Sequence, residues 1–438
     1  MVGAGILLGN ITGFFRVVVQ AYLLGTHARA DALAVAIGPV DTLNNAIINT
    51  MLVSFVPMLM LRPAADRAFV FARASRLFAR IFLAAGAAIA IFAPMLISIL
   101  GPGLAPSEHD QAVVLLRVLS PATLFAGSSA IFSALLYTER RFLVPALYQT
   151  CLNGATIIVG LSFWRIVGVS GLVLGYSVGA GIQLLLTWWF SRDLRRILRS
   201  EPRTPVEVAD LLAKPGAFLL YAGLISANIL VTRAFATHAG PGMAAAFDYC
   251  LRCISVVVAY MVYPAANSLT PEIARLRGLN QTPHAWRLIN KSVGLMAIAA
   301  VASCAVGIML RTPIISFMFE RGSFTPESTR LVSGVFLGFA PSIVGWALME
   351  LMSRCFFALD RPKMPIAAAF IPVTINVAIL SLMGKVTNPA LLGLGTSIGM
   401  LAGFVALFGA IYFRRGATPV QTSEPEDLSI LANLPRRG

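Results

Sequence analysis

Charged residues are scarce in this chain, and their scarcity limits what the protein can be. Of its 438 residues, 12% are charged and 58% are hydrophobic, and the mean hydropathy is +0.81. An ordinary soluble domain carries roughly 25% charged residues. The net charge of +15 is concentrated in short segments between apolar runs, which is typical of membrane topology rather than of nucleic-acid binding. The composition predicts an all-α polytopic membrane protein without a nucleic-acid partner.

The sequence also lacks the motifs of common enzymes and metalloproteins. Its four histidines have no metal-ligand spacing, and no HExxH, P-loop, nucleophile elbow or dinucleotide fingerprint occurs. All five cysteines lie in apolar runs, and the CxxC formed by Cys250 and Cys253 falls inside a predicted span, which is a poor setting for a metal or redox pair. We therefore expect no enzymatic activity, no metal and no cofactor.

Apolar runs long enough to cross a bilayer, which needs about 20 residues, follow one another along the whole chain. The first run starts almost directly after Met1 and lacks a basic leader, so we predict no cleavable signal peptide and expect that a short N-terminal segment is missing. We count twelve runs, at residues 2–24, 32–61, 81–104, 112–137, 143–163, 167–190, 216–237, 243–270, 292–318, 331–357, 364–384 and 387–413.

Basic residues are concentrated in every second connection between these runs. The connection over residues 101–111 contains none. By the positive-inside rule the basic connections, and with them both termini, are predicted to be cytoplasmic. The connection after the sixth run is the richest, with Arg192, Arg195, Arg196, Arg199, Arg203 and Lys214.

A long internal repeat organises the chain. A shift of 217 residues carries Asp31 onto Asp248, and a shift of 220 carries residues 119–146 onto 339–366. Such self-similarity indicates a duplicated unit of about half the chain. With six spans in each unit, the repeat predicts two six-helix lobes in the same orientation, related by a pseudo-two-fold axis along the membrane normal.

The repeat divides the chain into four predicted parts. The two lobes are residues 1–192 and 215–416. Between them, residues 193–214 form a cytoplasmic linker in which PVEVADLLAK (205–214) is predicted to be a short amphipathic helix, set off by prolines, that lies on the membrane surface. The polar, proline-containing tail at 417–438 is predicted to be disordered.

Ionisable residues at membrane depth are the first functional candidates, because a charge there costs at least about 2.5 kcal/mol unless it is paired or faces water. Asp248 and Arg252 lie four residues apart on one predicted helix face, in the favourable acid-then-base order. Arg16 lies within the first run beside Gly13, although an arginine at its depth can also snorkel to the interface. We expect Arg16 and Arg252 to face a cavity between the lobes, where the guanidinium fork suits phosphate oxygens.

The few acidic residues offer further candidates. Asp31 opens the second run, where helix capping is the simpler explanation. Asp41 and Asn44 give that helix a polar side that needs a cavity to face. Glu350 and Arg354 repeat the acid-then-base spacing near the end of the tenth run, as a coupling or structural pair. The acids are too scattered for a metal cage but leave room for one Na⁺ or H⁺ coupling site. The predicted substrate-binding residues are Arg16, Arg252, Asp31, Asp41, Asn44 and Asp248.

Five short stretches, each weak by itself, occur in an order that covers nearly the whole chain. They are LGNITGFFRVVVQAYLLG (8–25), ADALAVAIGPVDTLNN with SFVPML (30–45 and 54–59), LFARIF (77–82), ISFMFERGSFTPEST (315–329) and LMELMSRCFFALDRPKMP (348–365). Together they resemble the MurJ/MviN lipid II flippase family of the multidrug/oligosaccharidyl-lipid/polysaccharide exporter superfamily. The resemblance implies a V-shaped pair of lobes that moves a polyprenyl diphosphate-linked glycan, such as lipid II, across the bacterial cytoplasmic membrane by alternating access. It places Arg16, Arg252 and Asp31 at motif positions of the family.

The chain departs from that family at several positions. Asn10 stands where the family has a further basic residue, and Leu43 and Asn44 stand where it has an arginine pair. The family usually carries two additional C-terminal helices beyond the twelve runs found here. Two alternatives to a flippase therefore remain: a cation-coupled multidrug or small-molecule antiporter of the same superfamily, and a transport-inactive membrane scaffold. The expected partners are a lipid-linked glycan, membrane lipids and Na⁺ or H⁺ as a coupling ion.

Overall fold

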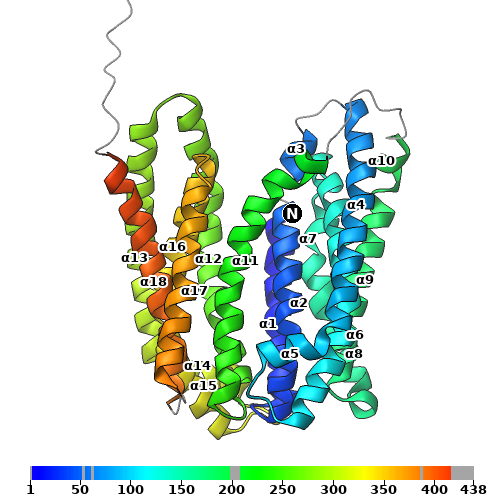
Figure 1. The fold of residues 1–438 in the computed structure, drawn as a ribbon, viewed down its shortest axis with the longest axis vertical. Helices are drawn as coiled ribbons and strands as arrows, with labels where there is room; N and C mark the ends of the chain where they lie inside the picture. The colour runs from blue at the N-terminus through cyan, green and yellow to red at the C-terminus, as the bar shows by residue number, and fades with distance from the viewer. Residues whose placement is uncertain (1, 52–54, 61–63, 198–207, 385–387, 416–438) are drawn as a thin grey trace, which may run out of the picture.

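Helices form all the regular secondary structure in the computed structural model, which describes residues 2–51, 55–60, 64–197, 208–384 and 388–415. They assemble into two lobes that lie side by side (Figure 1). The predicted all-α, two-lobed polytopic fold is confirmed.

The first lobe is built around the long helix α6, which packs against α2, α4 and α9, while α8 packs against α1 and α9. Its helices are α1 (Val2–Leu24), α2 (Ala28–Thr50), α3 (Val56–Met60), α4 (Ala64–Ile91), α5 (Ala93–Leu100), α6 (Pro106–Thr138), α7 (Leu143–Ala146), α8 (Tyr148–Val167), α9 (Ser170–Phe190) and α10 (Arg192–Ile197).

The second lobe repeats this packing. Helix α16 takes the place of α6 and packs against α12, α13 and α18, while α17 packs against α11 and α18. Its helices are α11 (Val208–Ala239), α12 (Met243–Gly278), α13 (Thr282–Met309), α14 (Arg311–Phe319), α15 (Pro326–Phe339), α16 (Ser342–Ala358), α17 (Lys363–Met383) and α18 (Pro389–Arg415). The same neighbours recur in both lobes, as a duplicated unit predicts.

Each of the twelve predicted runs coincides with a helix or a pair of consecutive helices. Within the described ranges, nine helices are long and apolar enough to span a membrane, or ten if α15 and α16, which bend by 49° at their junction, form one span. Helix α1 contributes only a shorter apolar stretch, Leu8–Leu24. Helix α2 is not among the nine, and its apolar run is interrupted by Asp31, Asp41 and Asn44.

The connection between the lobes differs from its prediction. The helix expected at 205–214 is not a separate element, because α11 begins at Val208 and continues past Pro215 to Ala239. Good helix formers precede that proline and offset part of the roughly 3 kcal/mol that a proline inside a helix costs through a lost hydrogen bond and a steric clash. The lobe boundaries stay a prediction, and the predicted disordered tail lies outside the described residues.

Candidate functional site

The two lobes meet along a small set of helices. Helix α2 of the first lobe packs against α11 and α12 of the second, α1 contacts α12 and α14, and α5 contacts α11. Helices α1, α2 and α12 carry all six predicted substrate-binding residues, so the candidate site lies at the interface between the lobes.

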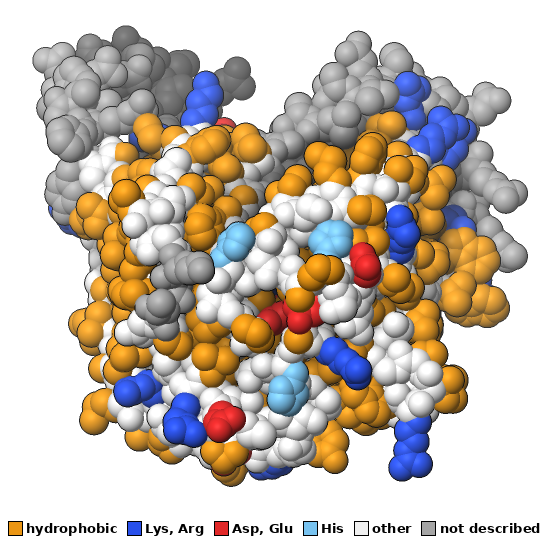
Figure 2. All heavy atoms as spheres, turned by 60° about the horizontal axis from the view of Figure 1, so that its bottom comes forward, with side chains coloured by type: hydrophobic (Ala, Val, Ile, Leu, Met, Phe, Trp, Pro, Cys, Tyr) orange, Lys and Arg blue, Asp and Glu red, His pale blue; other side chains and the backbone are white. Residues whose placement is uncertain are grey.

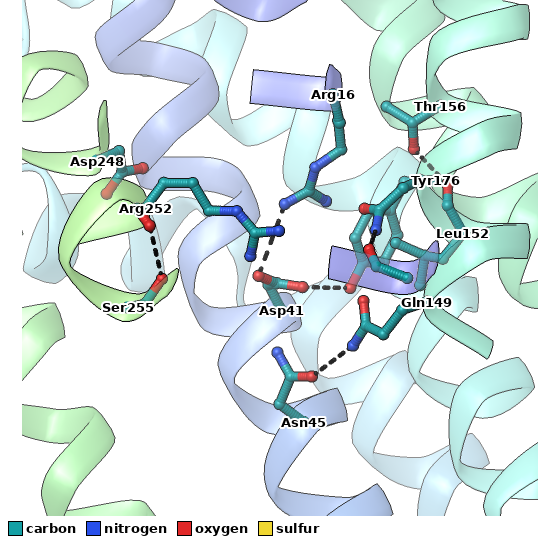
Figure 3. Close-up of polar contacts among 12 residues, drawn as sticks. Arg16, Asp41, Asn45, Gln149, Leu152, Thr156, Tyr176, Asp248, Arg252 and Ser255 are labelled. Carbon is teal, nitrogen blue, oxygen red and sulfur yellow. Dashed lines mark hydrogen bonds and ion pairs between the residues drawn. The ribbon is translucent and has the colours of Figure 1, made fainter. Parts of the chain in front are cut away.

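Arg16, Asp41 and Tyr176 form the polar centre of the first lobe's half of the interface (Figure 3). The Arg16 Nη2 atom lies 4.0 Å from Asp41 Oδ2, and the hydroxyl of Tyr176 donates a 2.9 Å hydrogen bond to Asp41 Oδ1. The guanidinium also lies 5.9 Å from the centre of the Tyr176 ring. The Arg16 side chain is only 11% exposed, whereas the Asp41 side chain is 35% exposed. Asp41 is therefore the part of this cluster that solvent reaches.

Arg252 reaches the same cluster from the second lobe. Its Nη2 atom donates a 3.1 Å hydrogen bond to the backbone carbonyl of Asn10, and the guanidinium lies so close to Gly13 that a Cβ atom there would overlap it. In Figure 3 the side chains of Arg16 and Arg252 extend from α1 and α12 towards Asp41. Two arginines from opposite lobes thus converge beside one carboxylate.

Several guanidinium donors in this cluster have no acceptor. Nε and Nη1 of Arg16 and Nε of Arg252 are buried, and none of them finds a hydrogen-bond partner in the described part of the chain. Buried donors are nearly always satisfied in folded proteins. An oxyanion placed between the two arginines would satisfy them with charge-assisted hydrogen bonds.

Asn44 lies one turn beyond Asp41 on α2 but inside the first lobe. It is 1% exposed, and neither of its amide atoms has a hydrogen-bond partner among the described residues. The neighbouring Asn45 instead accepts a 3.1 Å hydrogen bond from Gln149. The packing of the first lobe covers the Asn44 side chain in this conformation, and its contact with a substrate stays a prediction.

Asp31 is also placed differently from its prediction. Its carboxylate accepts hydrogen bonds from the backbone N–H groups of Gly242 (2.5 Å) and Ala245 (2.8 Å), and the residue is 2% exposed. A carboxylate is stabilised at a helix N-terminus by the free N–H groups and the helix dipole. Asp31 therefore caps α12 of the opposite lobe rather than its own helix. In this conformation both oxygens of the carboxylate are bound to the backbone of α12, and the contact of Asp31 with a substrate stays a prediction.

Further hydrogen bonds between the lobes gather at the same end of the molecule, here called the closed end, which is turned forward in Figure 2. In the loop before α15, Glu320 accepts a 2.7 Å hydrogen bond from Thr329, which lowers the pKa of Glu320. The bonds across the closed end join Tyr249 Oη to the Gly25 carbonyl (2.7 Å), Ser323 N to the Tyr22 carbonyl (2.9 Å), Thr26 Oγ1 to Ser328 Oγ (2.8 Å) and Gly103 N to Thr237 Oγ1 (3.0 Å).

Asp248 forms its ion pair with a different arginine from the one predicted. Its Oδ1 atom accepts hydrogen bonds from Nη2 (2.7 Å) and Nε (3.0 Å) of Arg233 on α11. The pairing with Arg252 is wrong, because Arg252 is directed across the interface to α1. Arg233 itself lies so close to Gly38 on α2 that a Cβ atom there would overlap the guanidinium.

The predicted pair of Glu350 and Arg354 is present, with 2.8 Å between Arg354 Nε and Glu350 Oε1. Tyr176, whose hydroxyl binds Asp41, was not among the predicted site residues, and neither were Gly13 and Gly38, which lie against Arg252 and Arg233. These glycines could have been found in the sequence by looking for a glycine on a polar helix face that lies opposite an arginine of another helix. Among the described residues, no group of His, Cys, Asp and Glu is arranged to hold a metal ion.

A bundle of membrane-spanning helices in two repeated lobes, with arginines from both lobes meeting at their interface, defines a polytopic membrane transporter. The family model described as "Lipid II flippase MurJ" matches residues 20–424. The chain belongs to the lipid II flippase MurJ family, so the resemblance noted in the sequence is confirmed. Membership makes it a multi-pass protein of the bacterial inner membrane.

Individual relatives and solved structures agree with this assignment. A probable lipid II flippase MurJ of Rhizobium meliloti (strain 1021) is 26% identical over 396 residues, covering 86% of this chain and 73% of the relative. One of Rickettsia prowazekii (strain Madrid E) is 21% identical over 313 residues, covering 70% of this chain and 61% of the relative. The chain thus spans only part of their length.

The fold is similar to two kinds of solved transporter. A structure of lipid II flippase MurJ in an inward closed conformation has a TM-score of 0.81 at 21% identity, covering 94% of this chain and 87% of that one. An inward-facing multidrug resistance MATE family transporter of the MOP superfamily has a TM-score of 0.79 at 14% identity, covering 93% of this chain and 95% of that one.

Proposed function

We propose that this chain is a flippase that carries a polyprenyl diphosphate-linked glycan, of the lipid II kind named for its relatives, across the bacterial inner membrane. The observation that carries the proposal is the convergence of Arg16 and Arg252 from opposite lobes, with three buried guanidinium nitrogens that find no acceptor among the residues the structure describes. A diphosphate offers several oxygens to such donors, and guanidinium forks bind them bidentately.

The site binds an anion by electrostatics and geometry, without covalent chemistry. Arg16 and Arg252 repel each other when no anion lies between them, and Asp41 partly neutralises Arg16. A diphosphate that bridges the two guanidinium groups replaces this repulsion with attraction to both lobes. Since the pair spans the interface, a bound anion favours the arrangement in which the lobes are close at this level.

Transport then requires the closed end to open. The closed end is held by the Asp31 cap and by the other hydrogen bonds between the lobes, so a substrate beside Arg252 cannot leave in that direction in this conformation. From the distribution of basic residues we infer that both termini are cytoplasmic, which makes the closed end the outer one. The substrate enters from the cytoplasmic side and leaves after the contacts of Asp31 with α12 have separated.

Coupling to Na⁺ or H⁺ is part of the proposal. Asp41, the carboxylate beside both arginines, is the candidate for binding the coupling ion.

A cation-coupled drug antiporter is the second candidate on the same fold. Two arginines with free donors favour an anionic substrate over a cationic drug. A substrate-dependent Na⁺ or H⁺ flux in proteoliposomes that is driven by drugs and not by lipid-linked glycans would favour the antiporter.

Replacement of Arg252 tests the proposal directly. We expect Arg252→Ala to abolish transport of a lipid-linked glycan in proteoliposomes while the protein still reaches the membrane. Arg361→Ala, which removes an exposed arginine after α16, is the matched control and retains transport. Normal flipping by a well-expressed Arg252→Ala protein would show that this arginine is not needed for transport.

Rescue of flippase-depleted cells by the unchanged chain would exclude the alternative of a transport-inactive scaffold.

A further inference from the structure

A second cluster of charged and aromatic side chains lies in the second lobe, apart from Arg16 and Arg252. Arg354 on α16 donates from Nε to Glu350 Oε1 at 2.8 Å, and its guanidinium lies 5.1 Å from the centre of the Tyr263 ring on α12. The hydroxyl of Tyr221 on α11 lies 3.4 Å from the other oxygen of Glu350. Glu350 is thus held by a second helix and fixes Arg354 over Tyr263.

Tyr263 of this cluster lies on the same face of α12 as Arg252. Tyr263 follows Arg252 by eleven residues, which is close to three full helical turns, so the two side chains share one face of α12 about 16 Å apart. The buried residue Ile254 lies on the opposite face of α12. Since α12 starts at the Asp31 cap, Tyr263 lies further from the closed end than Arg252 does.

The cluster presents unused binding groups to its surroundings. Tyr260 and Tyr263 are 49% and 43% exposed, and the Arg354 side chain is 34% exposed. Only Nε of Arg354 makes a hydrogen bond within the described part of the chain, so its two terminal nitrogens keep their donors. The bond to Glu350 and the contact with the Tyr263 ring order the Arg354 side chain, which has about 2 kcal/mol of rotamer entropy when free, and leave its two terminal nitrogens available to a ligand.

We propose that Arg354 and Tyr263 form a second contact site for the glycan head group whose diphosphate binds at Arg16 and Arg252. The apolar C–H face of a sugar ring packs against an aromatic ring, whose face carries partial negative charge. The terminal nitrogens of Arg354 donate to sugar hydroxyls or to a carboxylate on the head group. Glu350 is a positioning residue that aims Arg354. The inference rests on the proposed function, since it takes the diphosphate at Arg252 as its reference point.

The test compares two probes that differ only in the sugar: a polyprenyl diphosphate without glycan, and the same lipid carrying a disaccharide. Binding of each probe to the full chain in nanodiscs is measured for the unchanged protein and for Arg354→Gln, Tyr263→Leu and Arg252→Gln. Arg361→Gln is the control for loss of an exposed positive charge outside both sites. Thermal unfolding of each variant shows that it is folded.

We expect Arg354→Gln and Tyr263→Leu to weaken binding of the sugar-bearing probe by about tenfold, which corresponds to about 1.4 kcal/mol. Both variants should bind the sugar-free probe within about twofold of the unchanged protein, because the diphosphate site is intact. Arg252→Gln should weaken both probes, and Arg361→Gln neither. Glu350→Gln should resemble a milder Arg354→Gln, since the arginine remains but is no longer held.

Each other outcome overturns the second contact site, the diphosphate site or both. If folded Arg354→Gln and Tyr263→Leu bind the sugar-bearing probe normally, or weaken both probes equally, the second site is wrong and the proposed function stands. If Arg252→Gln leaves both probes unaffected while Arg354→Gln weakens the sugar-bearing one, the diphosphate site is wrong and the sugar contact stands. If the unchanged protein binds neither probe, both proposals are wrong.

Discussion

At the scale of single residues, two glycines of the first lobe allow arginines of the second lobe to approach their helices. Gly13 on α1 and Gly38 on α2 lie directly under the guanidinium groups of Arg252 and Arg233, where any Cβ atom would overlap. Both contacts join the lobes, and both depend on the absence of a side chain. The functional arginines are visible in the sequence as charges at membrane depth. The two glycines become meaningful only when the opposite lobe is in place.

Gly13→Ala is therefore expected to impair transport without removing any charged group. The added methyl group displaces the Arg252 guanidinium from the Asn10 carbonyl, and we expect a loss of about tenfold in transport rate, equivalent to about 1.4 kcal/mol. The readout is flipping of a labelled lipid-linked glycan in proteoliposomes. Gly154→Ala on α8 is the matched control, because a Cβ atom there would meet nothing within 4 Å. Equal rates for the two variants would contradict the role of Gly13.

At the scale of elements, helix positions follow from the sequence, whereas the partners of their polar groups do not. The twelve runs coincide with helices because a bilayer demands apolar segments of a given length. The i,i+4 rule predicted Glu350 with Arg354 correctly but failed for Asp248, since a competing arginine on a neighbouring helix was closer. Asp31 was identified as a capping acid, yet the helix that it caps belongs to the other lobe.

Loss of this cap should loosen the closed end. Removal of an N-capping side chain costs about 0.5–2 kcal/mol, so Asp31→Ala is expected to raise the population opened at that end by about 2-fold to 30-fold. A cysteine introduced at Thr26 in a background without the native cysteines reports opening through its rate of alkylation by a membrane-impermeant reagent. We expect faster labelling in the Asp31→Ala background. An unchanged rate would show that Asp31 does not hold this end closed.

At the scale of the whole molecule, the hydrogen bonds of the closed end set which side of the interface is accessible. The lobes repeat each other in packing, but the contacts between them are not symmetric: Asp31 binds the backbone of α12 in the other lobe, whereas its repeat counterpart Asp248 binds Arg233 of its own lobe. Transport by alternating access requires this set of contacts to break and re-form as a unit.

A reversible covalent lock tests this requirement. The hydroxyls of Thr26 and Ser328 lie 2.8 Å apart across the closed end, so Thr26→Cys and Ser328→Cys together are expected to form a disulfide on oxidation. With the five native cysteines replaced, oxidation of the double variant should stop transport and reduction should restore it, while each single variant transports under both conditions. Undiminished flipping by a fully cross-linked protein would mean that the closed end does not need to open.

The sequence by itself determined the class of membrane protein, the approximate position of nearly every helix, the duplication and the family. These properties depend on composition, segment length and local motifs, all of which can be counted along the chain. Only the tertiary structure decided which arginine faces which carboxylate, that Asn44 is covered, that Asp31 caps α12, and that α11 runs unbroken through Pro215. Pairings between buried charges depend on distances between helices that are far apart in sequence, and at close range a difference of a few ångströms decides which pair forms.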